Sequence, residues 1–213
     1  MSSQFDEPQQ RLLEEIMKAR RDVRGNHFLR DAPVSEDDVQ RILQAATWAP
    51  SVGYSQPWRF VVIRNDEIKL QVAQSFKQEN EKAAHLFDEK QQQYQQLKLE
   101  GILEAPVNIA VFYEPSNAPV LGQTSMQEMG EYSVVCAVQN MWLMARAMNV
   151  GMGWVCILNP GDVKQILSAP DNNKLVAYLC VGKVDQFLDR PELEQLKWQE
   201  AKILDSVVSF DGF

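Results

Sequence analysis

The sequence contains few of the residues that metal binding or histidine-dependent chemistry requires. It has two histidines and three cysteines in 213 residues. No two of the cysteines (Cys136, Cys156 and Cys180) have the C-x-x-C spacing typical of zinc or redox sites. We therefore expect no metal site, no disulfide framework and no Ser-His-Asp triad. We interpret the three cysteines as buried free thiols in a reducing cytoplasm.

Long apolar runs, export signals and an excess of basic residues are also missing. No uninterrupted apolar run reaches the roughly 18–20 residues that cross a bilayer, and the N-terminus lacks the basic and apolar regions of an export signal. The net charge of −8 argues against general binding to nucleic acid or an anionic membrane. The sequence therefore predicts a cytoplasmic protein that binds neither.

Nucleotide-binding glycine motifs are absent too. Neither G-x-G-x-x-G after the first expected strand nor G-x-x-x-x-G-K-[ST] occurs, so no Rossmann or P-loop site is indicated. The composition itself, with 45% hydrophobic and 23% charged residues, is that of an ordinary globular domain. A chain of this length forms one domain with a sizeable core, and we assign residues 1–213 to a single domain.

Hydrophobic spacing predicts an α+β layered fold. Helical periodicity favours helices at residues 8–21, 35–48, 131–148 and 162–167, with Ser35 as the N-cap of the second. Strands are expected at 60–63, 107–112 and 175–184, and a strand-like run lies within 150–158. The helix at 131–148 is apolar nearly all round, which indicates a central core helix or an oligomer interface.

Two polar segments stand apart from this pattern. Residues 66–104 are predicted to form two polar-faced helices broken near Phe87 and Asp88. They are either a mobile lid over a site or a solvated hairpin without a role. Residues 185–213 are predicted to form a terminal arm with scattered aromatic residues. Such an arm seldom folds alone, so we expect it to wrap a second subunit.

A cluster of three arginines around one acid occurs at residues 20–24, R-R-D-V-R. Arginine forks match the geometry of phosphate, so the cluster indicates a phosphate-bearing ligand with Asp22 beside it. Alternatively, the arginines cap the end of a preceding helix that stops near Gly25. On charge alone this second interpretation is the more ordinary one, because exposed clusters of this kind are common.

A second stretch, P-S-V-G-Y-S-Q-P-W at residues 50–58, has the chemistry of a ring-binding loop. Ser51 and Gln56 offer hydrogen bonds, and Gly53 permits close approach of the backbone. Tyr54 and Trp58 supply flat apolar walls. This combination suits a planar heteroaromatic ring with polar edges.

Together with R-R-D-V-R, this loop resembles the flavin-binding pattern of the nitroreductase-like FMN proteins. The similarity is greatest to their 5,6-dimethylbenzimidazole synthase (BluB) branch. Further resemblance lies in L-K-L-E-G (97–101), Y-S-V-V-C-A-V-Q-N (132–140) and V-G-M-G-W-V (150–155), and it extends from about residue 10 to about residue 198. Asp22 and Tyr54 favour this branch, because general nitroreductases usually carry Ser and Asn there.

The resemblance implies a fold and a reaction. The fold would be a layered one, with a central, mostly antiparallel sheet flanked by helices. Two chains would form a domain-swapped homodimer with the C-terminal arm exchanged, and an FMN site at the interface under each lid. The enzyme would use O2 to fragment reduced FMN to 5,6-dimethylbenzimidazole, the lower ligand of cobalamin, and erythrose 4-phosphate. An NAD(P)H:flavin reductase would supply the reduced FMN.

Two other functions stay open. One is an NAD(P)H-dependent FMN nitroreductase or quinone reductase that retains its flavin. The other is a flavin-binding protein without the fragmentation activity.

The resemblance also assigns roles to residues. The FMN contacts would be Arg20, Arg21, Val23 and Arg24 at the phosphate and ribityl end, Ser51, Gly53 and Gln56 along the flavin, and Lys90 and Leu99 in the lid. Asp22 matches the catalytic aspartate and would also contact the flavin. Close to the ribityl chain, it would accept or return a proton. We expect the flanking arginines to keep it ionised.

Cys156 departs from the family pattern, which has a serine near the flavin edge after G-W-V. A thiol is a weaker hydrogen-bond donor than a hydroxyl and is more easily oxidised. Cys156 either takes the serine's catalytic, flavin-contacting place with altered efficiency or marks different chemistry. A third interpretation is that it is a core thiol on a strand.

Overall fold

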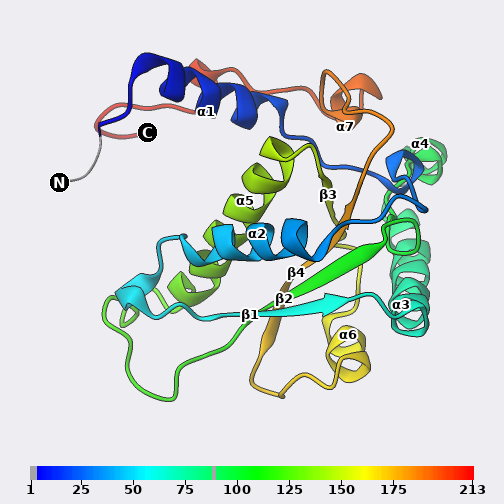
Figure 1. Cartoon of the computed structure of the whole chain (residues 1–213), viewed down its shortest axis with the longest axis horizontal. Helices are drawn as coiled ribbons and strands as arrows, with labels where there is room; N and C mark the ends of the chain where they lie inside the picture. The colour runs from blue at the N-terminus through cyan, green and yellow to red at the C-terminus, as the bar shows by residue number, and fades with distance from the viewer. Residues whose placement is uncertain (1–3, 88–89) are drawn as a thin grey trace.

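The computed structural model describes residues 4–87 and 90–213. A four-stranded antiparallel sheet with strand order β1-β2-β4-β3 forms its centre (Figure 1). The strands are β1 (Trp58–Ile63), β2 (Val107–Tyr113), β3 (Gly151–Trp154) and β4 (Lys174–Gly182). β2 and β4 lie in the middle and are buried over most of their length. The predicted antiparallel sheet is therefore confirmed.

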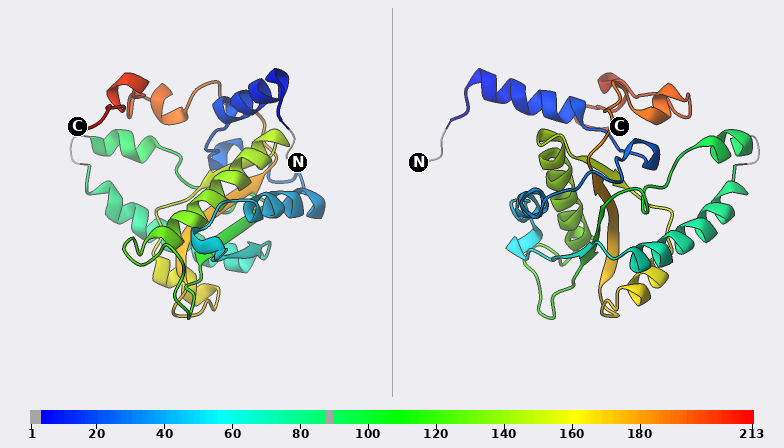
Figure 2. Two further views of the ribbon diagram at one scale, coloured as in Figure 1. Left: turned by 90° about the vertical axis from the view of Figure 1, so that its left-hand side faces the viewer. Right: turned by 45° about the vertical axis from the view of Figure 1, so that its right-hand side comes forward.

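Helices cover both faces of the sheet. In chain order they are α1 (Glu7–Ala19), α2 (Glu36–Thr47), α3 (Asp66–Ala84), α4 (Gln91–Gln96), α5 (Met129–Ala147), α6 (Pro160–Ile166) and α7 (Glu192–Gln195), with the short 3₁₀ helices η1 (Gly25–His27), η2 (Val52–Tyr54) and η4 (Leu204–Ser206). Ile109 and Val111 of β2 pack under α2 and α5, whereas Ala110 and Phe112 face α3 and α6. This alternation along one strand gives the sheet two apolar faces, and Figure 2 shows the helices on either side.

α5 is the central helix that the sequence predicts. It buries eight residues against the sheet and α2. Its opposite face leaves Tyr132, Val135 and Cys136 exposed. Cys156 is exposed as well, and only Cys180 is buried. The prediction of three buried thiols is therefore wrong for two of them, because an apolar stretch of sequence does not tell which face meets the core.

The predicted helix ends are only partly confirmed. Ser35 caps α2 as expected, since its Oγ accepts the N–H of Asp38 at 3.0 Å. α1 ends at Ala19, and Arg20 already has an extended backbone (φ −63°, ψ 133°). The helix expected to stop near Gly25 therefore ends earlier, and residues 20–24 follow it as an extended segment.

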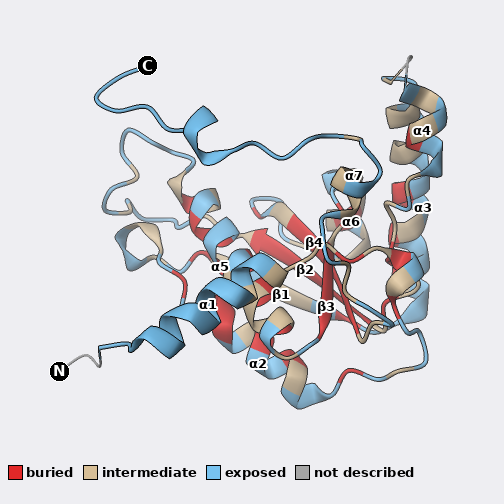
Figure 3. Ribbon diagram, turned by 90° about the horizontal axis from the view of Figure 1, so that it is seen from above, coloured by how far each residue is buried: buried red, intermediate tan, exposed pale blue. Residues whose placement is uncertain are grey.

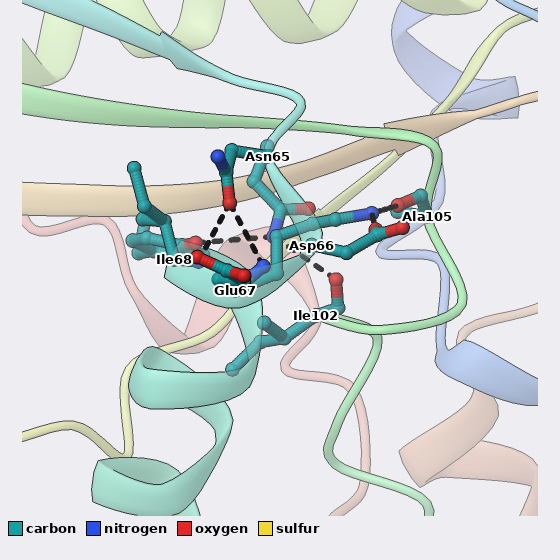
Figure 4. A network of polar contacts seen from close by, with 9 residues as sticks. Asn65, Asp66, Glu67, Ile68, Ile102 and Ala105 are labelled. Carbon is teal, nitrogen blue, oxygen red and sulfur yellow. Dashed lines mark hydrogen bonds and ion pairs between the residues drawn. The ribbon is translucent and has the colours of Figure 1, made fainter.

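The predicted lid segment, residues 66–104, divides into a packed part and an exposed part. Asn65 caps α3, and the buried Lys69 reaches the Ala105 carbonyl oxygen at 3.4 Å and Asp66 at 2.8 Å (Figure 4). Val72 and Phe76 belong to the core. The first half of α3 is thus fixed to the body of the domain, whereas residues 77–87 and 90–98 form its projecting part (Figure 2). The expected break near Phe87 and Asp88 falls partly on residues 88 and 89, which lie outside the described residues.

The two ends of the chain present apolar side chains to solvent. α1 buries no residue, and residues 199–213 are exposed throughout (Figure 3). The large apolar side chains left exposed there are Leu12, Leu13, Met17, Ile203, Leu204, Val207, Val208, Phe210 and Phe213. In the part of the chain that the structure describes, no helix is both long and apolar enough to cross a membrane.

Candidate active site

The segment Arg20–Arg24 runs alongside β3 and forms the floor of the candidate site. Asp22 pairs with Met152 in a parallel bridge, and the Val23 N–H donates to the Met152 carbonyl at 3.0 Å. Gly153 makes this approach possible, because a Cβ at that position would lie 2.1 Å from the Val23 carbonyl oxygen. A side chain of any size would therefore push the segment away.

Asp22 is held by two partners. Its Oδ1 accepts the Trp154 N–H at 2.9 Å, and its Oδ2 lies 2.5 Å from Nη2 of Arg24. Burial raises the pKa of Asp22, whereas Arg24, the Trp154 N–H and Arg20 lower it without cancelling that rise. The arginines thus favour the ionised form as expected, but burial, which the sequence did not indicate, outweighs them and leaves the pKa above its ordinary value. Desolvation penalises the carboxylate by more than the nearby positive charges stabilise it.

The two neighbouring arginines have different surroundings. Arg20 places its guanidinium carbon 4.9 Å from the centre of the Trp142 ring. Arg21 donates to the backbone carbonyls of Lys18 and Arg20 at 2.7 Å, of Leu188 at 2.8 Å, and of Asp189. The helix-capping interpretation therefore fits Arg21, which reaches a carbonyl in the last turn of α1. Arg21 also fastens residues 188–189 beside the cluster.

A cavity of about 400 Å³ opens beside this cluster. Its lining is Met17, Lys18, Arg20, Arg21, Asp22, Arg24 and residues 189–193. Five basic and three acidic side chains give it an excess of positive charge in a protein whose net charge is −8. Such a cavity fits a phosphate-bearing ligand. Arg190 was not foreseen here, since nothing in the polar 185–213 segment indicates where that segment runs.

Cys156 lies close to Asp22 but outside β3, which ends at Trp154. Although part of the residue is open to solvent, partial burial and the negative charge of Asp22 raise the pKa of its thiol. Its Sγ lies 3.8 Å from the Trp154 carbonyl oxygen. The interpretation of Cys156 as a core thiol on a strand is wrong. It is a protonated thiol at neutral pH on the segment that holds Asp22.

The ring-binding loop is strained and exposed. Gly53, Tyr54 and Gln56 all have positive φ angles, of 55°, 53° and 49°, and a Cβ on Gly53 would lie 2.6 Å from the Leu121 carbonyl oxygen. Ser51 Oγ accepts the Gln56 N–H at 3.1 Å. The Tyr54 side chain is left open to solvent, with the residue 82% exposed. Strain of this kind is concentrated at functional sites.

Within one chain, however, this loop and the arginine cluster lie at opposite ends of α5. The Val52 N–H donates to Ser133 Oγ in the first turns of α5, whereas Trp142 donates to the Arg21 carbonyl. Ser133 and Trp142 are nine positions apart, or about 14 Å along the helix axis. In Figure 1 the cyan turn η2 lies near one end of α5, and the end of α1 lies near the other. The two predicted halves of the flavin site are not brought together in a single chain.

The two lid residues have partners of their own. Lys90 Nζ donates to the Trp198 carbonyl at 3.2 Å and lies 5.0 Å from the centre of the Trp198 ring. Phe87 stacks on Tyr94 and meets the same tryptophan edge-on. Leu99 packs against the core cluster that includes Val23. Lys90 is therefore tied to the C-terminal segment, and Leu99 lies at the base of the projecting region.

Comparisons with known proteins place this chain among flavoenzymes. The family model described as "Nitroreductase family" matches residues 17–183. The 5,6-dimethylbenzimidazole synthase of Rhodospirillum rubrum is 42% identical over 193 residues, 89% of this chain and 90% of that protein. The synthase of Rhodobacter capsulatus is 35% identical, covering 92% and 95%. The crystal structure of oxidised iodotyrosine deiodinase bound to FMN and 3-iodo-L-tyrosine shares the fold, with a TM-score of 0.72, 22% identity, and coverage of 94% and 100%.

Proposed function

The chain belongs to the nitroreductase family and, within it, to the group of 5,6-dimethylbenzimidazole synthases, and on this premise we propose that it fragments reduced FMN with O2. The products would be 5,6-dimethylbenzimidazole, the lower ligand of cobalamin, and erythrose 4-phosphate. The observation that carries the proposal is the position of Asp22. Asp22, whose pKa is raised, lines a basic cavity between Arg20 and Arg24, in a chain 42% identical to a 5,6-dimethylbenzimidazole synthase.

The residues of the cavity suit the phosphate end of FMN. Arg20 and Arg24 would hold the phosphate and ribityl end, with Arg190 as a further cation at the rim. Arg21, whose donors face backbone carbonyls, would act by keeping residues 188–189 in place. Reduced FMN, when bound, supplies the electrons for O2 and the carbon skeleton of both products. The protein supplies binding, orientation and proton transfer.

Asp22 is suited to the proton transfers of this reaction. Its raised pKa brings it closer to the working pH than an ordinary aspartate, which favours both taking up and returning a proton. Trp154 and Arg24 fix both carboxylate oxygens. Cys156, whose thiol is protonated at neutral pH, would donate a weak hydrogen bond at the flavin edge where the family pattern has a serine.

We further propose that two chains complete each site. Ser51, Gly53 and Gln56 would line the flavin held by the arginines of the other subunit. The separation of the two halves along α5 supports this arrangement. The exposed apolar faces of α1, α5 and the C-terminal segment provide surfaces for such a homodimer. Lys90 and Leu99 would belong to the lid over the bound flavin, and a cytoplasmic NAD(P)H:flavin reductase would supply reduced FMN.

One experiment tests this function. Purified protein is mixed with reduced FMN in air-saturated buffer, and the products are separated by chromatography and identified by mass. Formation of 5,6-dimethylbenzimidazole in proportion to the protein present is the expected result. Plain reoxidation to FMN would contradict the proposal and indicate a flavin-binding protein. Rapid NAD(P)H oxidation with nitro compounds or quinones, without the fragment, would indicate a reductase instead.

A further inference from the structure

Trp142 joins the two segments on which Asp22 depends. It lies on α5, is 9% exposed, and its Nε1–H donates to two backbone carbonyls, those of Arg21 and Met152, each at 3.0 Å. Arg21 precedes Asp22, and Met152 is the residue that pairs with Asp22 in the parallel bridge. One indole N–H is therefore hydrogen-bonded both to the segment Arg20–Arg24 and to β3.

The face of the same indole supports Arg20. The guanidinium carbon lies 4.9 Å from the ring centre, within the range of a favourable cation–π contact, for which tryptophan is the best aromatic partner. In residues 4–87 and 90–213, Arg20 forms no salt bridge and no side-chain hydrogen bond. Its hydrogen-bonding fork remains available to an anion in the cavity, unlike that of Arg21.

We infer that Trp142 is a positioning residue for both functional groups of the site, and this inference rests on the proposed function. The ring would hold the Arg20 fork toward the phosphate of FMN. The N–H would hold the backbone of residues 21–22 against Met152 and so fix the place of Asp22. The two roles use different parts of one side chain, so different substitutions separate them.

The phosphate preference of the protein provides a readout that mere support of the core would not change. Riboflavin has the ring and the ribityl chain of FMN but no phosphate. The ratio of the two dissociation constants therefore reports on the phosphate contacts alone. A general loosening of the core would weaken binding of both flavins together and leave their ratio unchanged.

The experiment compares wild type, Trp142→Phe, Trp142→Leu, Arg20→Gln, the Arg20→Gln/Trp142→Leu double variant and the control Met141→Ala. Met141 is a fully buried neighbour on α5, so its truncation disturbs the core without removing an aromatic or a hydrogen bond. Binding of FMN and riboflavin is measured by titration, and product per bound flavin by single-turnover mixing with reduced flavin in air.

The expected results differ between the two substitutions. Trp142→Leu lowers the preference for FMN by about three- to tenfold, the range of a partly exposed cation–π contact, and has no further effect on that preference in the Arg20→Gln background. Trp142→Phe keeps a ring under Arg20 and most of the preference. It lowers product per bound flavin, because the Arg21 and Met152 carbonyls lose their shared donor. Met141→Ala changes neither quantity.

Three outcomes would overturn the inference. A wild-type preference for FMN that survives in Trp142→Leu would remove the ring from the phosphate site. Full product yield in Trp142→Phe would remove the N–H from the positioning of Asp22, and this comparison holds even if Trp142→Leu fails to fold. A wild type that fails to prefer FMN or to yield the fragment would contradict the proposed function itself, and the inference with it.

Discussion

Asp22, the proposed catalytic residue, has a pKa that is set by competing physical effects. Positive charge from Arg24 and a hydrogen bond from Trp154 favour its ionised form, while burial favours the neutral one, and burial is the larger effect. The same surroundings hold both carboxylate oxygens in a defined orientation. A carboxyl group whose pKa is raised in this way holds its proton to a higher pH than an ordinary solvated aspartate, which favours proton exchange with a bound substrate.

Replacing Asp22 with Asn should separate binding from chemistry. The amide is nearly isosteric but cannot take up a proton, so product formation should fall by at least about 100-fold. FMN binding should be kept or become tighter, because one of the three acidic side chains lining the cavity is neutralised. Titration with FMN and single-turnover product analysis measure the two quantities. A variant with normal product yield would remove Asp22 from the mechanism.

The same substitution should change how stability depends on pH. Because the native state raises the pKa of Asp22, it binds this proton more tightly than the unfolded chain does. The wild type should therefore lose stability relative to Asp22→Asn as the pH rises from the ordinary aspartate pKa through the raised one. Urea unfolding of both proteins at several pH values between 4 and 7 tests this. A difference that does not vary with pH would show that Asp22 has an ordinary pKa.

Gly153 should tolerate no side chain. In Gly153→Ala the new Cβ would meet the Val23 carbonyl oxygen at 2.1 Å, a backbone atom that cannot move without shifting Asp22. We expect product yield to fall by at least about tenfold and the unfolding free energy by about 1–3 kcal/mol, as in other overpacked sites. Gly212→Ala is the control, because nothing lies within 4 Å of its added Cβ. Wild-type yield in Gly153→Ala would mean that the segment does not need this close approach.

At the scale of elements, residues 188–198 connect the basic cluster to the projecting helix α4. Their first residues accept hydrogen bonds from Arg21. Their last residue, Trp198, contacts Lys90, Phe87 and Tyr94, and Gln93 of α4 donates to the Leu196 carbonyl at 2.8 Å. The position of α4 is therefore set by a segment that is itself fastened at the proposed phosphate site.

Removing the Trp198 ring should release α4 without unfolding the domain. Each aromatic or cation–π contact of this kind contributes about 0.5–1.5 kcal/mol, so Trp198→Ala should raise the local opening of residues 90–97 by about tenfold or more. Amide hydrogen exchange of that region measures the effect, with Trp198→Phe as the control that keeps a ring. If exchange in Trp198→Ala matches the wild type, the ring does not hold the helix.

At the scale of the whole molecule, the important relation is between two ends of one helix. The strained loop at residues 51–56 is placed by the start of α5, and the arginine cluster by its end. On the proposed composite site, the two parts of one chain serve different flavins. A two-fold homodimer that lays α5 of each subunit beside the other would bring complementary ends together.

Mixed dimers test this composite site. Asp22→Asn inactivates the arginine cluster. Gly53→Val distorts the loop at residues 51–56, because valine disfavours the positive φ of this position and its Cβ would clash with the Leu121 carbonyl oxygen. In a dimer of one chain of each kind, one site is intact and the other carries both changes. A random mixture should then regain about a quarter of wild-type product yield from two inactive parents. No recovery, despite confirmed mixed dimers, would mean that each site is built from one chain.

Local sequence patterns were enough to predict most helices and strands of this fold and the two motifs of the proposed site. The period of apolar residues, the Ser35 cap and the buried strands depend on neighbours within a few positions, so local spacing suffices to predict them. The motifs at residues 20–24 and 50–58 also indicated a flavin family, because they resemble the binding pattern of that family. The family comparisons confirmed that prediction.

The surroundings of those residues became visible only in the folded chain. The hydrogen bond that Trp154 gives to Asp22, the contacts of Arg21 with the Leu188 and Asp189 carbonyls, and the effect of Asp22 on the pKa of Cys156 all join groups more than 100 positions apart. The placement of the two motifs at opposite ends of α5 likewise follows from packing. Desolvation and hydrogen bonding act through space, and the spacing of residues along a chain carries no information about which distant groups will remove water from a carboxylate or occupy a guanidinium.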